Sequence, residues 1–150
     1  MRRATRDALG LTLGVLVLTT TATAPAQGVP EIAAPWLDDI ALARISMTGA
    51  VIYVNPNRCK EVGPFVCAFV RQHELAHVTL NHASAYYTAY VNGRALAEAE
   101  ADCWAAKNSL LVNVKAAIAH FESPALLNLD VGDHGTGRER AKRIRACRGL

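Results

Sequence analysis

The sequence is short of several features that would assign it to a common class of protein. Beyond its N-terminal region, no segment is long and apolar enough to span a bilayer, which argues against a multi-spanning membrane protein. It has no Cys-x-x-Cys pair, which argues against a metal site made of cysteines alone. Its net charge is only +3, so neither nucleic acid nor another polyanion is indicated as a partner.

The N-terminal region has the pattern of a secretory signal peptide. Basic residues precede a short apolar stretch, and Ala24-Pro25-Ala26 provides a cleavage site with small residues at both ends. The sequence therefore predicts a signal peptide over residues 1–26 and a single domain over residues 27–150, exported to the periplasm or the cell exterior. An uncleaved membrane anchor is the alternative, but the apolar stretch is short for a bilayer span.

The predicted domain contains all 4 cysteines of the chain. An even number of cysteines in an exported protein indicates that they are paired in disulfides, and four cysteines allow three pairings. We favour Cys59–Cys67, which closes a short loop, and Cys103–Cys147, which ties the C-terminal segment to the rest of the domain. Such bridges are structural and restrict the unfolded chain.

The strongest motif is His73-Glu74-Leu75-Ala76-His77, which has the form HExxH. It lies in an apolar-periodic stretch from Phe65 to His82 that predicts a helix. On that helix the two histidines lie about 40° apart, in the middle of the apolar stripe, where an unpaired polar ring is costly. Two histidines with a glutamate between them therefore indicate a metal site. His82 would lie on the opposite side of the helix from His73. Its distance along the chain from His77 also differs from that of the third histidine in metzincins, so we interpret it as a surface or helix-end residue.

The third ligand is expected from a second helix. The segment Arg94–Lys107 is rich in strong helix formers and carries three acidic residues. Glu98 and Asp102 are four residues apart and share one face, whereas Glu100 points away. Glu98 is the favoured ligand, and Asp102 would accept the other ring N–H of a ligand histidine. Ordinary solvated acidic residues on a surface helix are the alternative.

The remaining segments complete an α+β domain that is mostly helical and contains a short strand or small sheet. Trp36–Ile45 suits a short amphipathic helix. Ala50–Val54 suits a strand, which could offer its free edge to an extended peptide or simply pack in a small sheet. Further helices are expected over Leu110–Phe121 and over Arg138–Arg148, the second of them basic with a solvated face. A tyrosine cluster, whose members would pack in the core or on the surface or would line a cleft, comprises Tyr86, Tyr87 and Tyr90.

HExxH followed by Glu98-Ala99-Glu100-Ala101-Asp102 resembles the pattern of the gluzincin zinc peptidases. The E-x-E-A-D form is similar to that of the CAAX prenyl protease/HtpX-type endopeptidases. The resemblance covers roughly residues 59 to 147 and implies a small zincin-like domain in which His73, His77 and Glu98 bind one Zn²⁺. It also implies that His134 and Arg140, which follow the ligand helix, lie near the substrate.

The sequence thus predicts an exported zinc metallopeptidase whose partner is a peptide or protein substrate. Glu74 would take a proton from a zinc-activated water and deliver it to the leaving amine. His134 could donate a hydrogen bond to the tetrahedral intermediate, and Arg140 could hold its loop or a substrate carbonyl. Two alternatives stay open: a catalytically inactive zinc-binding or interaction module on the same scaffold, and a structural domain without a metal.

Overall fold

The structure, a computed structural model, describes residues 28–84 and 92–150. The predicted signal peptide and the tyrosine cluster of Tyr86, Tyr87 and Tyr90 lie outside the described residues. Within these two ranges the chain forms a 3-stranded sheet and a larger set of α-helices, which confirms an α+β class that is mostly helical. None of the helices described is long and apolar enough to cross a membrane.

The sheet has the strand order β1-β3-β2, with β1 at Glu31–Ala33, β2 at Ala41–Ser46 and β3 at Gly49–Val54. β3 pairs in parallel with β1 and antiparallel with β2. The predicted strand is therefore confirmed as β3, and of its two alternatives the structure supports packing in a small sheet, because both edges of β3 are hydrogen-bonded. β2 is the outer strand that contacts the HExxH helix.

The predicted helix over Trp36–Ile45 is also wrong. Turns occupy its first half, and β2 begins at Ala41. Exposure alternates along this strand, since Ala41 is buried whereas Leu42 is exposed. The apolar residues of this segment fit a period of two as well as a helical period, and pairing with β3 decides between the two.

The helical part begins directly after the sheet. Asn55 caps the first helix, because its side chain accepts hydrogen bonds from the backbone N–H groups of Asn57 and Arg58. Gly63, with a φ of 87°, separates this helix from the HExxH helix. The helices are α1 (Pro56–Val62), α2 (Pro64–Thr79), α4 (Gly93–Asn108), α5 (Leu111–Phe121) and α6 (Gly137–Arg148), with a short 3-10 turn η1 (Gly132–His134) before α6.

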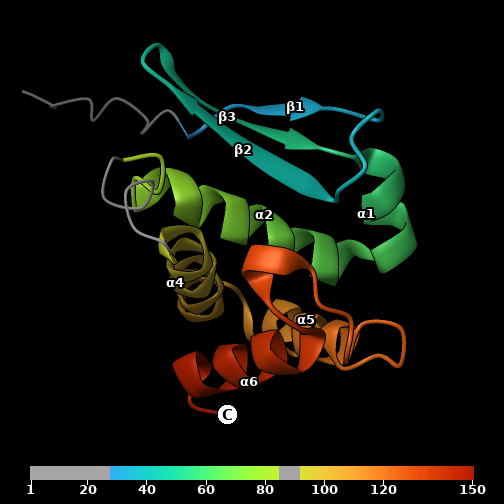
Figure 1. The fold of residues 1–150 in the computed structure, drawn as a ribbon. Helices are drawn as coiled ribbons and strands as arrows, with labels where there is room; N and C mark the ends of the chain where they lie inside the picture. The colour runs from blue at the N-terminus through green and yellow to red at the C-terminus, as the bar shows by residue number, and fades with distance from the viewer. Residues whose placement is uncertain (1–27, 85–91) are drawn as a thin grey trace, which may run out of the picture.

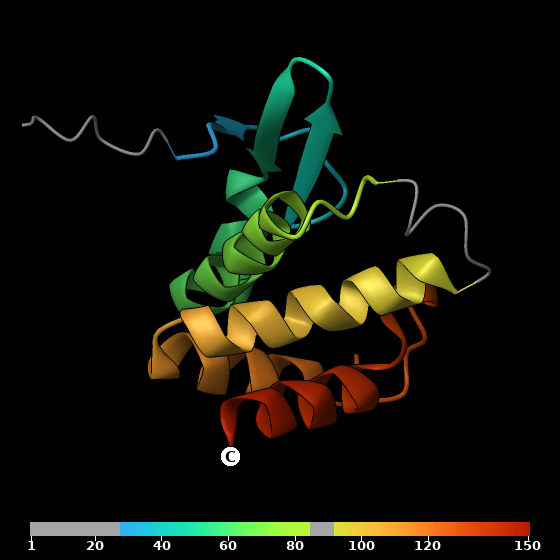
Figure 2. The same ribbon diagram turned by 90° about the vertical axis from the view of Figure 1, so that its left-hand side faces the viewer.

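Helix α2 runs through the middle of the molecule, with the sheet on one side and α4, α5 and α6 on the other (Figure 1). A view turned by 90° shows α4 crossing α2, with α6 beneath α4 (Figure 2). Val66 and Val70 of α2 pack against the sheet in one hydrophobic cluster. Phe69 belongs to a second cluster formed with α4, α5 and α6. Each layer therefore has its own core, and α2 contributes to both.

Both predicted disulfides are present. Cys59–Cys67 joins α1 to the first turn of α2, and Cys103–Cys147 joins α4 to the end of α6. Helix α6 is confirmed, and a capping box of Thr136 and Glu139 fixes its start. The expectation that its basic residues are solvated is wrong for Arg143, which turns toward Asp102 of α4, as Arg140 also does.

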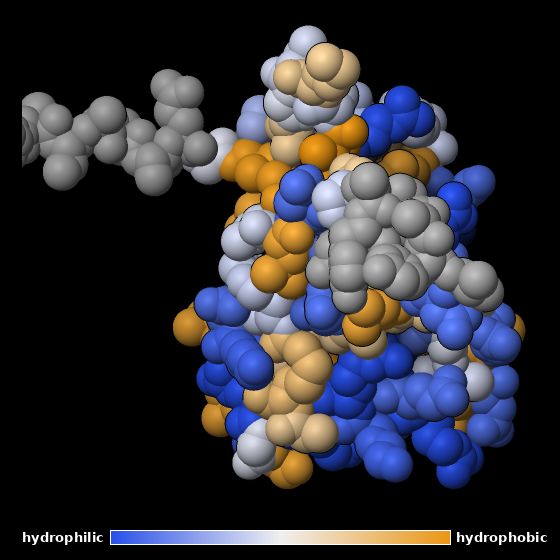
Figure 3. All heavy atoms as spheres, turned by 60° about the vertical axis from the view of Figure 1, so that its left-hand side comes forward, coloured by the Kyte–Doolittle hydropathy of each residue, from blue (hydrophilic) through white to orange (hydrophobic). Residues whose placement is uncertain are grey.

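The surface differs between the two layers. Seen from the side where the chain enters α4, hydrophobic residues gather near the sheet, whereas hydrophilic residues cover most of the helical layer (Figure 3). Trp36 and Leu42 are among the exposed apolar residues of the sheet layer. Leu129 and Val131, which precede η1, are exposed apolar residues of the helical layer.

Candidate metal centre

Helix α2 brings His73 and His77 to one face, one turn apart. The Nε2 atom of His73 lies 3.1 Å from Nε2 of His77. Glu98 of α4 points its carboxylate at both rings, with Oε2 at 2.9 Å from Nε2 of His73 and 3.4 Å from Nε2 of His77. One ligand atom from each residue lies within 4.8 Å of the other two. The three side chains can therefore hold a metal ion.

The separations suit a tetrahedral site. Ligand atoms at about 2.0–2.1 Å from a central zinc ion lie about 3.3 Å from one another. The observed values of 2.9, 3.1 and 3.4 Å fall on both sides of that spacing. Two imidazole nitrogens and one carboxylate oxygen make three ligand atoms, one fewer than a tetrahedral zinc ion takes. The centre thus has the donor set of an open, three-ligand site.

Asp102 fixes the orientation of His73 by binding Nδ1, the ring nitrogen that does not face Glu98 and His77. It lies one turn after Glu98 on the same face of α4, and its side chain is 0% exposed. Its Oδ1 is 3.0 Å from Nδ1 of His73, so the ring donates Nδ1–H to the carboxylate and directs Nε2 toward Glu98. The shared face predicted for Glu98 and Asp102 is observed, and Glu100 lies off it, nearer to His82.

Two arginines of α6 hold Asp102 in turn. Arg140 donates from Nη2 at 2.7 Å and from Nε at 3.1 Å, and Arg143 donates from Nη1 at 2.8 Å. The guanidinium carbon of Arg140 also lies 4.1 Å from the centre of the Phe121 ring. A buried carboxylate with three charge-assisted hydrogen bonds keeps its charge and its position.

Burial disfavours the charged forms of Asp102, Glu98 and His73, but the contacts among their side chains stabilise these forms more strongly. Burial alone would raise the pKa of Asp102, but Arg140 and His73 hold it below its usual range. Hydrogen bonds from the surrounding imidazoles likewise hold the pKa of Glu98 below its usual range. Burial alone would lower the pKa of His73, but the hydrogen bonds with Asp102 and Glu98 raise it to about 9. Two ionised carboxylates thus face the ligand rings, and a metal ion would take the place of the His73 proton.

Glu74 lies beside the centre and is 8% exposed. Its Oε2 accepts a hydrogen bond of 2.6 Å from the backbone N–H of Ala43. That N–H belongs to β2, so the strand holds the carboxylate in place. Burial raises the pKa of Glu74, which favours proton uptake by this carboxylate.

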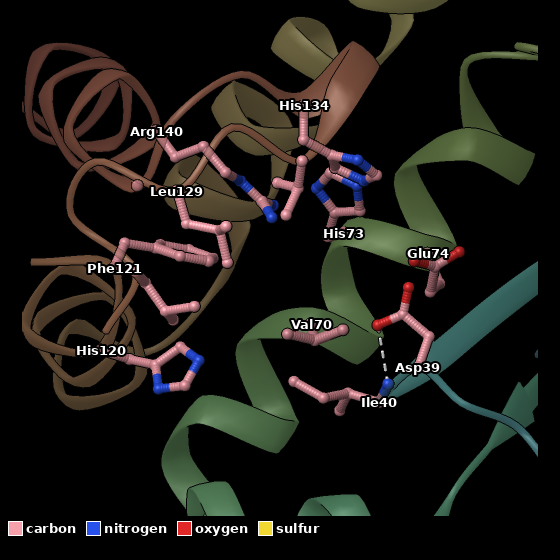
Figure 4. A pocket seen from close by; sticks show the side chains of 13 residues that line it. Asp39, Ile40, Val70, His73, Glu74, His120, Phe121, Leu129, His134 and Arg140 are labelled. Atoms are coloured by element: carbon pink, nitrogen blue, oxygen red, sulfur yellow. Dashed lines mark hydrogen bonds between the residues drawn. The ribbon is translucent and has the colours of Figure 1, made fainter. Parts of the chain in front are cut away.

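A cavity of about 210 Å³ opens beside His73 and Glu74. Figure 4 shows Val70 and Ile40 on one side of it and Phe121 on the other. Apolar side chains from the segment between α5 and α6 complete the wall, namely Leu126, Leu129 and Val131. The cavity therefore joins the charged centre to a largely apolar depression.

The structure brings His134 and Arg140 to the centre. His134 lies on η1 with its Nε2 at 2.9 Å from Oε2 of Glu98, and its ring stacks on that of His73 at a centroid distance of 5.8 Å (Figure 4). Arg140 reaches the centre through Asp102. The roles predicted for both in substrate binding stay predictions.

The interpretation of His82 as a surface residue is wrong. Its side chain is 7% exposed, and its Nδ1 lies 2.9 Å from Nδ1 of His77. Burial, followed by the neighbouring His77, lowers the pKa of His82. The prediction assumed that the helix continues to His82, but α2 ends at Thr79, and the chain then turns back toward the metal centre. His82 is not one of the three clustered ligand residues.

Sequence reasoning also missed the contributions of Arg143 and Ala43. Nothing in the local pattern distinguishes Arg143 from the other basic residues of α6, because its partner lies 41 residues earlier in the chain. The cavity wall left a partial signal, since Leu129 and Val131 are apolar residues that alternate with the polar residues Asn128 and Asp130. Exposed apolar side chains beside polar groups often mark a binding site.

Comparisons with protein-family models, with curated proteins and with solved structures find no match to this chain.

Proposed function

We propose that the protein is an exported zinc-dependent endopeptidase of the gluzincin type. The observation that carries the proposal is the position of Glu74, a buried carboxylate beside a centre of two histidines and one glutamate. Structural zinc sites usually have four protein ligands, whereas hydrolytic sites have three and a nearby general base. The two disulfides are compatible with an oxidising compartment outside the cytoplasm.

Each side chain has a defined task in this proposal. His73, His77 and Glu98 would hold the zinc ion, which would supply Lewis acidity toward a carbonyl group and a water molecule. Glu74 accepts a proton from the attacking water and returns it to the leaving amine nitrogen. His134 donates a hydrogen bond to the substrate oxygen on which negative charge develops.

The substrate is proposed to be an extended peptide. A depression follows β2, lined by Leu42, Ala43 and Ile45, and continues to Glu74. The cavity described above begins on the other side of the same carboxylate. A peptide lying along the outer side of β2 would therefore pass Glu74 and reach the cavity with an adjacent side chain.

The cavity favours an apolar side chain next to the bond that is cleaved. Leu129 is 50% exposed and Val131 47% exposed, so both have apolar surface available to a ligand. The buried ring of Phe121 forms the base of the wall opposite α2. We expect cleavage beside Leu, Phe or Met in preference to charged residues.

Two measurements on the mature protein test the proposal. Elemental analysis after zinc-replete expression should find close to one zinc per chain, and less than about a tenth would contradict the site. A quenched-fluorescence peptide library and unfolded casein should be cleaved, and a chelator should abolish cleavage.

Glu74→Gln is the matched control for the catalytic step. It keeps the shape of the side chain and the oxygen that accepts from Ala43, but it cannot take a proton. We expect zinc content to be retained and hydrolysis to fall by at least about 100-fold. Zinc binding with no cleavage by the wild-type protein would instead favour a non-catalytic zinc-binding module.

A further inference from the structure

The end of α2 brings His82 back against the ligand His77. Asn81 has a φ of 54°, and within the described ranges it is the one non-glycine residue with a positive φ. The N–H of His82 donates to the carbonyl of His77 at 3.0 Å, and the N–H of Asn81 donates to that of Val78 at 3.2 Å. These two bonds define a Schellman motif, in which a left-handed residue reverses the chain after the last helical turn.

In a Schellman motif the residue after the left-handed position usually makes an apolar contact with the last helical turn. Here that contact joins two imidazoles, with ring centroids 4.8 Å apart and planes at 79°. The Nδ1 atoms of His82 and His77 are 2.9 Å apart, which is a hydrogen bond. An aliphatic side chain could fill this buried position at lower cost, so the polar ring indicates a specific partner.

The neighbours determine which nitrogen carries each proton. Nε2 of His77 faces His73 and Glu98, so its lone pair is needed there for a metal. With a metal bound at Nε2, the proton of His77 would lie on Nδ1 and be donated to Nδ1 of His82. His82 then carries its own proton on Nε2, which lies 3.4 Å from Oε2 of Glu100.

We propose that His82 is a positioning residue for His77, in the way that Asp102 is for His73. It fixes the tautomer and the ring plane of His77 through Nδ1, while α2 fixes the position of the backbone. The two ligand histidines then have different partners, an ionised carboxylate for His73 and an imidazole for His77. This inference rests on the metal centre of the proposed function.

Three substitutions at one position test the role. His82→Asn places an amide oxygen close to the position of Nδ1 and keeps the acceptor. His82→Phe keeps a buried ring without an acceptor, and His82→Ala removes both. Asn81→Gly is the matched control, because glycine keeps the left-handed backbone and leaves His82 in place.

Zinc affinity is measured by competition with a chromophoric chelator, and the visible absorption of the Co²⁺-substituted protein reports the geometry of the ligands. We expect His82→Phe and His82→Ala to bind zinc about 10-fold more weakly or worse, with an altered Co²⁺ spectrum. His82→Asn and Asn81→Gly should remain close to wild type in both measurements. Urea unfolding in the presence of a chelator shows whether each variant is folded.

Equal zinc affinity for His82→Phe and His82→Asn would overturn the role of His82 while leaving the metal centre intact. Absence of zinc binding by the wild-type protein would overturn the role and the proposed function together. If His82→Ala does not fold, the comparison of His82→Phe with His82→Asn still tests the role of His82, because both side chains fill the buried position.

Discussion

Three side chains from two helices meet at the carboxylate of Asp102. His73 contacts it from α2, and Arg140 and Arg143 contact it from α6. Burying a lone carboxylate costs several kcal/mol, and this cost is offset only because every side of the group has a charged or hydrogen-bonding partner. The same residue thus contacts a candidate metal ligand, His73, and joins α6 to α4.

We expect Asp102→Asn to weaken zinc binding and stability together. The amide keeps the shape but removes the charge that Arg140 and Arg143 face. Zinc affinity should fall by about 10- to 100-fold. The free energy of unfolding, measured with urea in the presence of a chelator, should fall by about 3 kcal/mol. Lys107→Gln, at an exposed position of the same helix, should change neither quantity, and unchanged affinity in Asp102→Asn would show that His73 needs no ionised partner.

At the scale of elements, local patterns predicted the helices well and the ends of elements poorly. The composition around Glu98 placed both ends of α4 within one residue, whereas the apolar period around His73 placed the start of α2 within one residue and its end three residues too late. β2 was missed because its conformation depends on pairing with β3, which a local pattern does not contain. His82 was misplaced because one left-handed residue, Asn81, ends the helical projection.

The start of α6 requires a glycine. A Cβ atom on Gly137 would lie 2.3 Å from the carbonyl oxygen of Phe121 and 2.5 Å from that of Leu126. Backbone carbonyls cannot move aside cheaply, so Gly137→Ala should lower the free energy of unfolding by about 1–3 kcal/mol. Gly28→Ala is the matched control, because nothing lies within 4 Å of its Cβ position. Equal stability of the two variants in urea would show that the connection before α6 adapts freely.

The two disulfides should differ in their contribution. Cys103–Cys147 spans 44 residues and Cys59–Cys67 spans 8. Loop-closure entropy predicts a stabilisation of about 4 kcal/mol for the long loop and about 2.5 kcal/mol for the short one. Replacing each pair of cysteines by serines and comparing the free energies of unfolding in urea tests which disulfide stabilises the protein more. A larger loss for the Cys59–Cys67 pair would mean that its effect arises in the folded state at the α1–α2 junction.

At the scale of the whole molecule, the centre forms where the layers meet. The sequence could indicate His73, His77 and Glu98 because each pattern lies within a single helix. It could not indicate the cavity, whose walls combine Ile40 from before β2 with Leu129 from before η1. Residues that far apart along the chain are brought together only by the packing of complete elements on α2.

A metal ion at this centre would link α2 to α4, and through Asp102 to α6, so binding should stabilise the whole domain. A ligand that binds only the folded state at 100 times its dissociation constant adds about 2.7 kcal/mol to the free energy of unfolding. For a domain of this size that corresponds to a rise in Tm of roughly 10 °C.

Zinc added to chelator-treated protein should therefore raise Tm in a concentration-dependent manner, as followed by circular dichroism, whereas Mg²⁺ should have little effect, because it prefers oxygen ligands. His73→Ala removes one ligand of the cluster and should lose the response to zinc. If His73→Ala responds as the wild type does, the stabilising zinc binds elsewhere. The link between α2 and α4 would then depend on side-chain packing and on hydrogen bonds such as that of His73 with Asp102.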